Sequence, residues 1–278
     1  MKLFHLRGGN GRKVNVLIIG ERINTSRKEI AYAVAKKDAD FIKLEAKKQA
    51  EAGAHFIDVN CGTNIHTEIE ELKWVVQLAQ SVVNLPLCID SPNPKAIEAA
   101  LEVHKGRAFI NSVTAESQRA EAILPLVKKY DCFIIGLAMG EAGVPATAEE
   151  RCTAAKQVLE FTDKFGIDRE RLYIDAVVQS IATGPDQGLE FLNALKLIKT
   201  TLGLKTIAGL SNISFGLPKR TVLNSSFLSM AISYGLDAAI IDLTNPGIYS
   251  SFKAAEVLVG RDAFCQEYIS AFRSGKIN

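Results

Sequence analysis

The sequence predicts a (β/α)8 barrel, and two observations lead to this prediction. Short runs rich in Val, Ile and Phe recur along the chain, and longer segments with apolar residues three and four positions apart separate them. Eight such pairs fit into 278 residues, close to the ~250 residues typical of this barrel. A doubly wound open sheet is the alternative, but it usually carries a glycine-rich turn after its first strand. Residues 20–24, Gly-Glu-Arg-Ile-Asn, contain no GxGxxG motif.

The expected strands are short and apolar, and the expected helices follow them in turn. The strands are predicted at residues 14–20, 55–59, 87–90, 108–112, 132–137, 172–175, 205–209 and 238–242. The helices are predicted at residues 42–52, 69–83, 94–105, 119–130, 148–165, 188–202, 218–234 and 251–272. Gly53, Gly166, Gly203 and Gly235 directly follow periodic runs and are expected helix C-caps. No Pro- or Ser-rich linker interrupts the alternation, so we expect one domain over residues 1–278, with residues 1–13 as an N-terminal lead-in.

The composition is that of an ordinary globular protein, with 47% hydrophobic and 23% charged residues. Lys and Arg number 33 against 31 Asp and Glu, so electrostatics favour neither nucleic acid nor an anionic membrane as a partner. Five cysteines without a CxxC pair make a disulfide framework or a structural zinc site unexpected. No apolar run has the length of a signal peptide core or a membrane span. We therefore expect a cytoplasmic protein.

Polar residues stand at or just past seven of the eight expected strand ends. They are Asn24, Asp58, Asn60, Asp90, Asn111, Asp175, Asn212 and Asp242. The fifth strand ends instead in Leu137-Ala138-Met139. In a barrel all these ends meet at one mouth. Carboxylates and amides there suit a ligand with paired N–H donors, and a pterin ring fits because its N3–H and 2-amino group face a carboxylate side by side.

Residues 209–220, Gly-Leu-Ser-Asn-Ile-Ser-Phe-Gly-Leu-Pro-Lys-Arg, form a polar, glycine-containing turn between an apolar strand and an apolar-periodic helical run. An expected strand leads into this turn, and Pro218 is expected at the first position of the next helix. Ser211, Asn212 and Ser214 would then lie at the carboxyl end of the strand, where parallel α/β folds bind ligands.

Each polar strand end also has a purely structural interpretation as a turn or a helix cap. Asp242, followed by Thr-Asn-Pro-Gly, fits a turn particularly well. Other chemistries have little support. Cys61 is an alternative nucleophile but has no evident His or cationic partner. No His cluster has metal-ligand spacing, so no bound metal is expected. No Lys ends a strand, which argues against a Schiff-base aldolase.

Six segments together resemble the pterin-binding methyltransferases. They are residues 17–24 (LIIGERIN), 57–60 (IDVN), 88–91 (CIDS), 110–112 (INS), 172–175 (LYID) and 209–220. Within that family the chain is similar to the methyltetrahydrofolate:corrinoid protein methyltransferases and to the folate module of cobalamin-dependent methionine synthase. The resemblance implies a (β/α)8 barrel, usually a homodimer, that binds tetrahydrofolate or 5-methyltetrahydrofolate in its mouth. It also implies methyl exchange with the cobalt of a corrinoid (cobalamin). No DxHxxG corrinoid-binding sequence is present, so the corrinoid is expected on a separate protein.

The resemblance also implies roles for individual residues. Asp58, Asp90, Asn111 and Asp175 match the residues that hold the pterin, Asn212 matches the amide that approaches N5, and Arg220 matches a basic residue of the pterin site. Asn24, Met139, Ser214 and Asp242 fall in segments that line the pocket. Asn212 and Asp175 are the expected catalytic residues, because the N5 leaving group needs a hydrogen-bond donor as the methyl departs.

Two other functions stay open at this point. Dihydropteroate synthases share the barrel and several strand-end residues, but they carry a Lys on the seventh strand and a Ser followed by a basic pair. Here Ser211 is followed by Asn212, which disfavours the synthase. A pterin-binding subunit without catalytic activity, within a methyltransferase complex, is the third candidate. The sequence leaves the direction of methyl transfer open.

Overall fold

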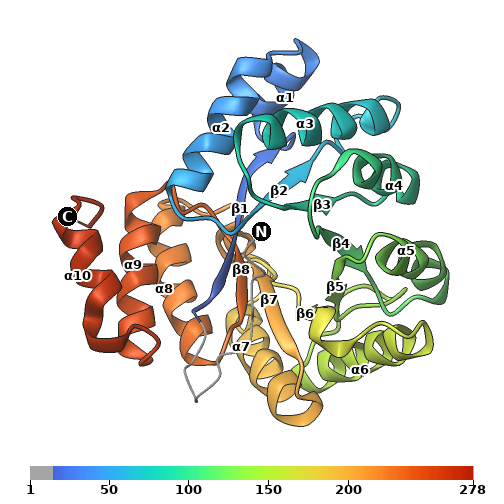
Figure 1. Ribbon diagram of the computed structural model, residues 1–278. Coiled ribbons are helices and arrows are strands. Elements are labelled where there is room, and N and C mark those ends of the chain that lie inside the picture. Colours follow the sequence, from blue (N-terminus) through green and yellow to red (C-terminus); the bar gives the residue numbers. More distant parts are fainter. Residues whose placement is uncertain (1–14, 278) are drawn as a thin grey trace.

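Eight parallel strands close into a barrel in the order of the chain, with helices around its outside (Figure 1). The computed structural model describes residues 15–277. The strands are β1 (Leu17–Asn24), β2 (Phe56–Asn60), β3 (Leu87–Asp90), β4 (Phe109–Val113), β5 (Phe133–Leu137), β6 (Leu172–Asp175), β7 (Lys205–Gly209) and β8 (Ala238–Ile240). Since β8 pairs in parallel with β1 and closes the circle, the predicted (β/α)8 barrel is confirmed.

The helices alternate with the strands as the apolar periodicity predicted. They are α1 (Lys28–Ala35), α2 (Ala39–Glu51), α3 (Glu68–Val82), α4 (Pro94–Val103), α5 (Ser117–Lys129), α6 (Ala148–Lys164), α7 (Gln187–Leu197), α8 (Arg220–Ser233), α9 (Pro246–Leu258) and α10 (Gln266–Arg273). Shorter helical turns are η1 (Arg169–Arg171), η2 (Ile198–Leu202), η3 (Leu210–Ser214) and η4 (Ala263–Cys265). The four glycines expected as C-caps all have positive φ, between 67° and 102°, the conformation that such a cap needs.

The first strand lies further along the chain than the sequence pattern indicated. It runs to Asn24 because, after an irregularity between Gly20 and Ile23, it pairs with β2 again through Ile23 and Val59. Residues 1–13, the expected lead-in, lie outside the described residues. A short helix, α1, also precedes α2 where a single helix was expected.

Two helix boundaries differ from the prediction for local conformational reasons. Pro218 does not open α8, because Lys219 adopts the left-handed conformation with φ 52° and the helix begins at Arg220. The single helix expected at residues 251–272 is two helices, α9 and α10. The chain breaks between them at Gly260, whose φ is 73°. A positive φ cannot continue a right-handed helix.

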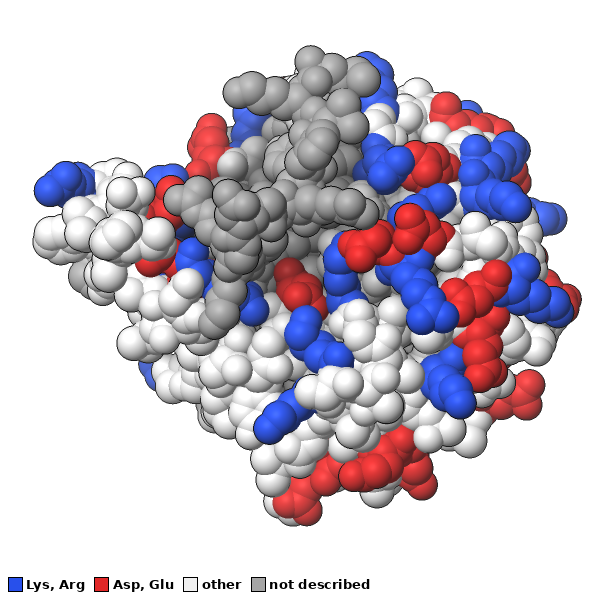
Figure 2. All heavy atoms as spheres, turned by 60° about the horizontal axis from the view of Figure 1, so that its bottom comes forward, with Lys and Arg blue, Asp and Glu red and all other residues white. Residues whose placement is uncertain are grey.

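The apolar core has two parts. The larger part lies between the outer faces of the strands and the surrounding helices, with Ile18, Ile57 and Ile89 among its fully buried residues. The smaller part fills the inside of the barrel. On the molecular surface, basic and acidic side chains lie side by side over the face in Figure 2.

Four aromatic rings occupy the amino-terminal half of the barrel interior, and we call them the aromatic layer: Phe56, Phe109, Phe133 and Tyr173. Phe109 is at its centre, with ring centroids 4.9 Å from Phe56, 4.8 Å from Phe133 and 5.1 Å from Tyr173. Side chains two residues further along a strand point to the same side, so the residues after this layer line the carboxyl end of the barrel, here called the mouth.

Candidate functional site

At the mouth, the strands that carry the aromatic layer present carboxyl and amide side chains instead of rings. Strand alternation places Asp58 and Asn60 above Phe56, and Asn111 above Phe109. In the same way Asp175 lies above Tyr173. The strand register then aligns four of the mouth residues side by side, namely Asn24, Asn60, Asp90 and Asn111. The structure thus brings the sequence-predicted residues of strands one to four together at one end of the barrel.

Asp58 and Asp90 form a close pair of carboxyl groups in this mouth. Burial, and then the negative charge of Asp90, raise the pKa of Asp58 well above its usual value. Burial also raises the pKa of Asp90 to about 6, against a hydrogen bond from Asn60 Nδ2 to Asp90 Oδ2 at 2.9 Å. Two adjacent carboxyl groups ionise one at a time, so the pair retains a proton that Asp58 holds more tightly.

Asp58 has a further property that indicates a ligand. Its Oδ1 is buried and has no hydrogen-bond partner among the described residues. Buried polar atoms are rarely left without a partner. An unpaired oxygen at the mouth can therefore accept a hydrogen bond from a bound molecule.

Asp175 lies on the other side of the mouth, and two backbone groups orient it. Val177 N–H donates to Oδ1 at 2.7 Å and Gly209 N–H donates to Oδ2 at 3.3 Å. Burial raises the pKa of Asp175 to about 6, although both hydrogen bonds act against that rise. Each carboxylate oxygen has a second lone pair for a ligand.

Asn212 lies on η3, directly beyond β7, and its side chain is exposed. A Cβ atom on Gly209 would lie 3.2 Å from Asn212 Nδ2. Gly209 thus leaves space for the amide of Asn212 and at the same time donates to Asp175. The two residues expected to be catalytic therefore adjoin the same glycine.

Arg220 supports the loop that carries Asn212. Its Nη2 donates to the carbonyl of Ser211 at 2.6 Å, and its Nε donates to Ser214 Oγ at 3.0 Å. Ser214 is fully buried and donates to Asn224 Oδ1 at 2.7 Å. The expectation that Ser214 lines the pocket needs correction, because its hydroxyl lies beneath the loop and is used in holding it.

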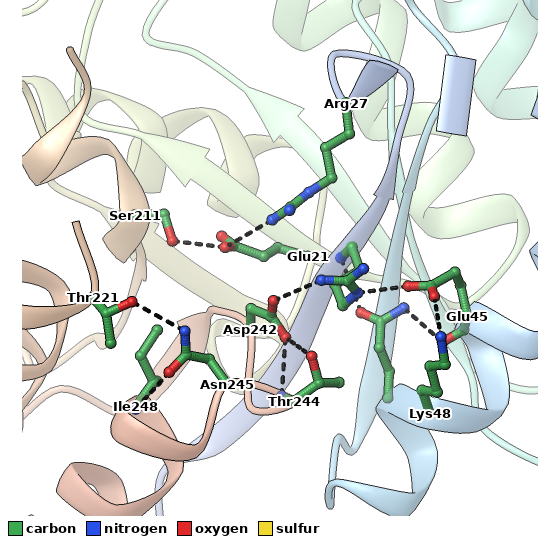
Figure 3. A network of polar contacts seen from close by, with 12 residues as sticks. Glu21, Arg27, Glu45, Lys48, Ser211, Thr221, Asp242, Thr244, Asn245 and Ile248 are labelled. Carbon is green, nitrogen blue, oxygen red and sulfur yellow. Dashed lines mark hydrogen bonds and ion pairs between the residues drawn. The ribbon is translucent and has the colours of Figure 1, made fainter. Parts of the chain in front are cut away.

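The other three residues expected at lower priority occupy the rim. Asp242 accepts hydrogen bonds from Thr244 at Oδ1 (Figure 3). Its Oδ2 pairs with Arg22 at 3.1 Å. Both of its oxygens have partners, so it stabilises the turn after β8, as the alternative interpretation of this residue stated. Asn24 likewise accepts from Ser26 N at 2.9 Å. Met139 follows β5 and is half-buried.

Glu21 is a mouth residue that the strand-end pattern missed. It lies two positions after inward-facing Ile19, and its Oε1 accepts from Ser211 Oγ at 2.6 Å and pairs with Arg27 at 3.4 Å (Figure 3). Burial raises its pKa, and the Ser211 hydrogen bond opposes this. Glu21 connects the first strand to the loop of Asn212. The extension of β1 past Gly20 was the missing information, because it places Glu21 inside the barrel.

Two buried histidines and Cys61, the alternative nucleophile, have contacts or environments that fit structural roles. His55 Nδ1 accepts from Ile18 N at 2.9 Å and His104 Nε2 accepts from Leu87 N at 3.0 Å. Burial raises the pKa of Cys61 to about 12, so it is a poor nucleophile. Over residues 15–277 no group of three or more His, Cys, Asp or Glu side chains could hold a metal ion. In the same range no helix has the length and apolar character to cross a membrane.

Comparisons with known proteins agree with this geometry. A family model described as "Pterin binding enzyme" matches residues 20–242. Methylcorrinoid:tetrahydrofolate methyltransferase of Eubacterium limosum is 35% identical over 265 residues, which are 94% of this chain and 98% of that protein. The methionine synthases of Mycobacterium leprae and Mycobacterium tuberculosis are each 32% identical over 83% and 82% of this chain, but only 20% of their own lengths.

Among solved structures, dihydropteroate synthase from Xanthomonas albilineans in complex with 7,8-dihydropteroate has a TM-score of 0.64. The match covers 88% of this chain and 94% of the synthase, at 19% sequence identity. At that identity the likeness establishes the barrel fold and leaves the reaction to be argued from the site.

Proposed function

The chain belongs to the pterin-binding enzyme family, and on that premise we propose that it transfers a methyl group between N5 of methyltetrahydrofolate and the cobalt of a corrinoid. The observation that carries this proposal is the 35% identity to the Eubacterium limosum methyltransferase over 94% of this chain and 98% of that protein. The similarity to a fifth of each methionine synthase supports the same assignment. The direction of transfer is left open.

The folate head group is proposed to bind in the mouth. The pterin ligands in this proposal are Asp58, Asp90, Asn111, Asp175, Asn212 and Arg220. The ring presents N3–H and the 2-amino group as two parallel donors, and a carboxylate accepts both in a fork geometry. Asp90 and Asp175 are ionised at neutral pH, since their pKa values are about 6. The unpaired Oδ1 of Asp58 offers an additional acceptor.

Asn212 is the proposed catalytic amide. Methyl transfer from N5 is an in-line displacement, and the departing nitrogen develops negative charge unless a donor stabilises it. The side-chain N–H of Asn212 can donate to N5, and the rotated amide can accept from N5–H in the reverse reaction. Asp175, which adjoins Gly209 with Asn212, is proposed to assist proton exchange at N5.

The methyl acceptor or donor is proposed to be a separate corrinoid protein that docks over the mouth. The barrel would hold the pterin rigidly while the cobalt approaches, and much of the rate would come from this positioning. A homodimer, a cytoplasmic location and the absence of a bound metal, nucleic acid or membrane partner remain predictions. Light scattering and metal analysis of the purified protein test the first and third of these directly.

A dihydropteroate synthase activity is the alternative from the same family. The fold likeness supports it, but β7 ends in Gly209 rather than Lys, and Ser211 is followed by Asn212. The strand end therefore lacks the lysine that serves the pyrophosphate leaving group in the synthases. A non-catalytic pterin-binding subunit predicts folate binding without transfer.

One assay separates these functions. Adding 5-methyltetrahydrofolate and this protein to cob(I)alamin should convert the cob(I)alamin spectrum to that of methylcobalamin. Failure with both free cob(I)alamin and a corrinoid protein, together with folate binding, would favour the non-catalytic subunit. Release of pyrophosphate from a pterin pyrophosphate in the presence of p-aminobenzoate would favour the synthase.

A further inference from the structure

Arg151 on α6 is the largest side chain that is fully buried in the described chain, and it reaches the segment that follows Asp175. Its Nη1 donates to the carbonyls of Ala176 and Val177, each at 3.2 Å. Three further hydrogen bonds hold the guanidinium, and their acceptors are the carbonyl of Pro145 and the side-chain oxygens of Gln179 and Gln187. The side chain thus joins α6 to the loop at the carboxyl end of β6.

This placement of Arg151 is unfavourable for stability taken alone. A buried cation requires compensation by a nearby anion, yet Arg151 makes no ion pair within 4 Å among residues 15–277. It also lies in the first turns of α6, where the helix dipole disfavours positive charge. The nearest negative charges that act on it belong to Glu190 and Asp175. The Glu190 carboxylate caps the first turn of α6, because its Oε2 accepts from Ala148 N at 2.7 Å.

The loop that Arg151 holds is strained at Val177. This β-branched residue has φ 61°, a conformation that such residues almost never adopt. Strain of this kind persists only where the surroundings impose it, and the two hydrogen bonds from Arg151 to carbonyls 176 and 177 do so. The result is functional, because the strained Val177 N–H is the group that donates to Asp175 Oδ1 at 2.7 Å.

We propose that Arg151 is the positioning residue for Asp175: it holds Val177 in the left-handed conformation that orients the Asp175 carboxylate toward the pterin. This rests on the proposed function, in which Asp175 binds the folate head group. Arg151 itself does not touch the substrate in this proposal. Its positive charge has a second effect, because it opposes the burial that raises the pKa of Asp175 to about 6.

The experiment measures binding of 5-methyltetrahydrofolate by calorimetry to the wild type and to Arg151→Gln and Arg151→Lys. We expect Arg151→Gln to weaken binding roughly 10- to 100-fold, the scale of a lost charge-assisted hydrogen bond at Asp175. Arg151→Lys keeps the charge but lacks the several N–H donors of the guanidinium. Its folate affinity should lie between those of the wild type and Arg151→Gln. If Arg151→Gln does not fold, Arg151→Lys carries the test, with at least a roughly 5-fold loss expected on the same grounds.

A rescue variant separates positioning from general stability. Glycine adopts a positive φ without strain, so Val177→Gly should keep the N–H that donates to Asp175 Oδ1 in place without help from Arg151. In the Arg151→Gln background the same change should restore a large part of the lost affinity, because the loop no longer needs Arg151 to stay left-handed. A merely structural role of Arg151 predicts no such rescue.

The pH dependence provides a second readout. The charged groups acting on this segment are Arg151 of α6 and, through Arg151, Glu190 of α7. Without the cation, Asp175 should protonate at higher pH, so folate binding to Arg151→Gln should begin to fall at a higher pH than in the wild type. Arg151→Lys should show little of this shift.

Arg171→Gln is the matched control. Arg171 precedes the same strand at the opposite end of the barrel, where it donates to the carbonyls of Cys132 and Val127 at 2.8 and 2.7 Å. Its replacement should lower the melting temperature and leave folate affinity unchanged. A folded Arg151→Gln protein with wild-type affinity and pH midpoint would overturn the positioning role. A wild type that binds no folate would overturn the proposed function, and this inference with it.

Discussion

The two ends of the barrel interior are built from the same strands and have opposite chemistry. At the amino-terminal end, Phe56, Phe109 and Tyr173 pack against one another and are buried. Two residues later, the same strands place Asp58, Asn111 and Asp175 at the mouth. The first layer stabilises the fold through apolar burial, whereas the second buries carboxyl groups whose pKa values rise because they lose water. Along β2, β4 and β6, the apolar packing residues and the proposed binding residues are therefore two positions apart.

The largest expected effect comes from replacing a ring of the aromatic layer by an amide side chain of the kind found at the mouth. Phe109→Asn removes the central ring and buries an amide without partners, which should lower the free energy of unfolding by at least about 4 kcal/mol. Urea unfolding followed by circular dichroism measures this. Phe272→Asn is the control, because Phe272 is 64% exposed and its replacement should change stability by less than about 0.5 kcal/mol. Equal stability of the two variants would mean that the aromatic layer does not support the barrel.

The next effect falls on the reaction and leaves the fold intact. Asn212→Ala should slow methyl transfer by roughly 10²-fold, the scale of removing one preorganised donor, with a smaller loss of folate affinity and an unchanged melting temperature. Single-turnover conversion of cob(I)alamin measures the rate. Asn193→Ala, at an exposed position of α7, should transfer methyl at the wild-type rate. A wild-type rate for Asn212→Ala would refute the role of this amide at N5.

Replacing Asp90 is expected to raise stability and to lower folate affinity, and both changes should be smaller than those above. Asp90→Asn keeps an acceptor for Asn60 and removes the charge beside Asp58, so the free energy of unfolding at about pH 8 should rise by roughly 1–3 kcal/mol. Folate affinity should fall roughly 30-fold, because a charge-assisted hydrogen bond is lost. Asp163→Asn, on the surface beside Arg169, should change neither quantity. Loss of stability in Asp90→Asn would contradict the view that the mouth carboxyls are retained for binding.

The smallest effect is a pH dependence that the mouth should show and the aromatic layer should not. Asp90 and Asp175 have pKa values of about 6 in the folded protein, above the usual 3.8. The folded state therefore binds more protons between about pH 4 and pH 6. Their contribution to stability is fully present below that window and is lost as pH rises through about 6.

Folate binding should have the opposite sign. Protonated carboxyls no longer accept from the pterin donors, so affinity should fall up to about 10-fold per pH unit for each proton taken up below about pH 6. Calorimetry across pH 5 to 8, with urea unfolding at the same pH values, checks both trends. The aromatic layer contributes nothing here, because burial raises the pKa of Tyr173. Folate affinity independent of pH would exclude ionised carboxylates as its ligands.

Most of the fold was predictable from local pattern. The predicted strands at residues 87–90, 172–175 and 205–209 coincide with β3, β6 and β7, because short apolar runs between turn residues have few alternatives. The end of β1 was missed because Glu21 and Arg22 are polar, and only pairing with β2 extends the strand over them. The break at Gly260 was missed because the apolar periodicity continues on both sides of it.

The sequence by itself determined the barrel and the set of polar residues at its strand ends, because hydrophobic alternation and strand termination are local properties of the chain. Only the tertiary structure decided which of these side chains lie together in the mouth and which are used to hold its loops. Strand register brings Asp90 beside Asn60 and Asn111, packing turns the Ser214 hydroxyl beneath its loop, and Arg151 holds the loop that orients Asp175. These contacts join residues far apart in sequence, so their geometry follows from closure of the barrel and cannot be obtained from spacing along the chain.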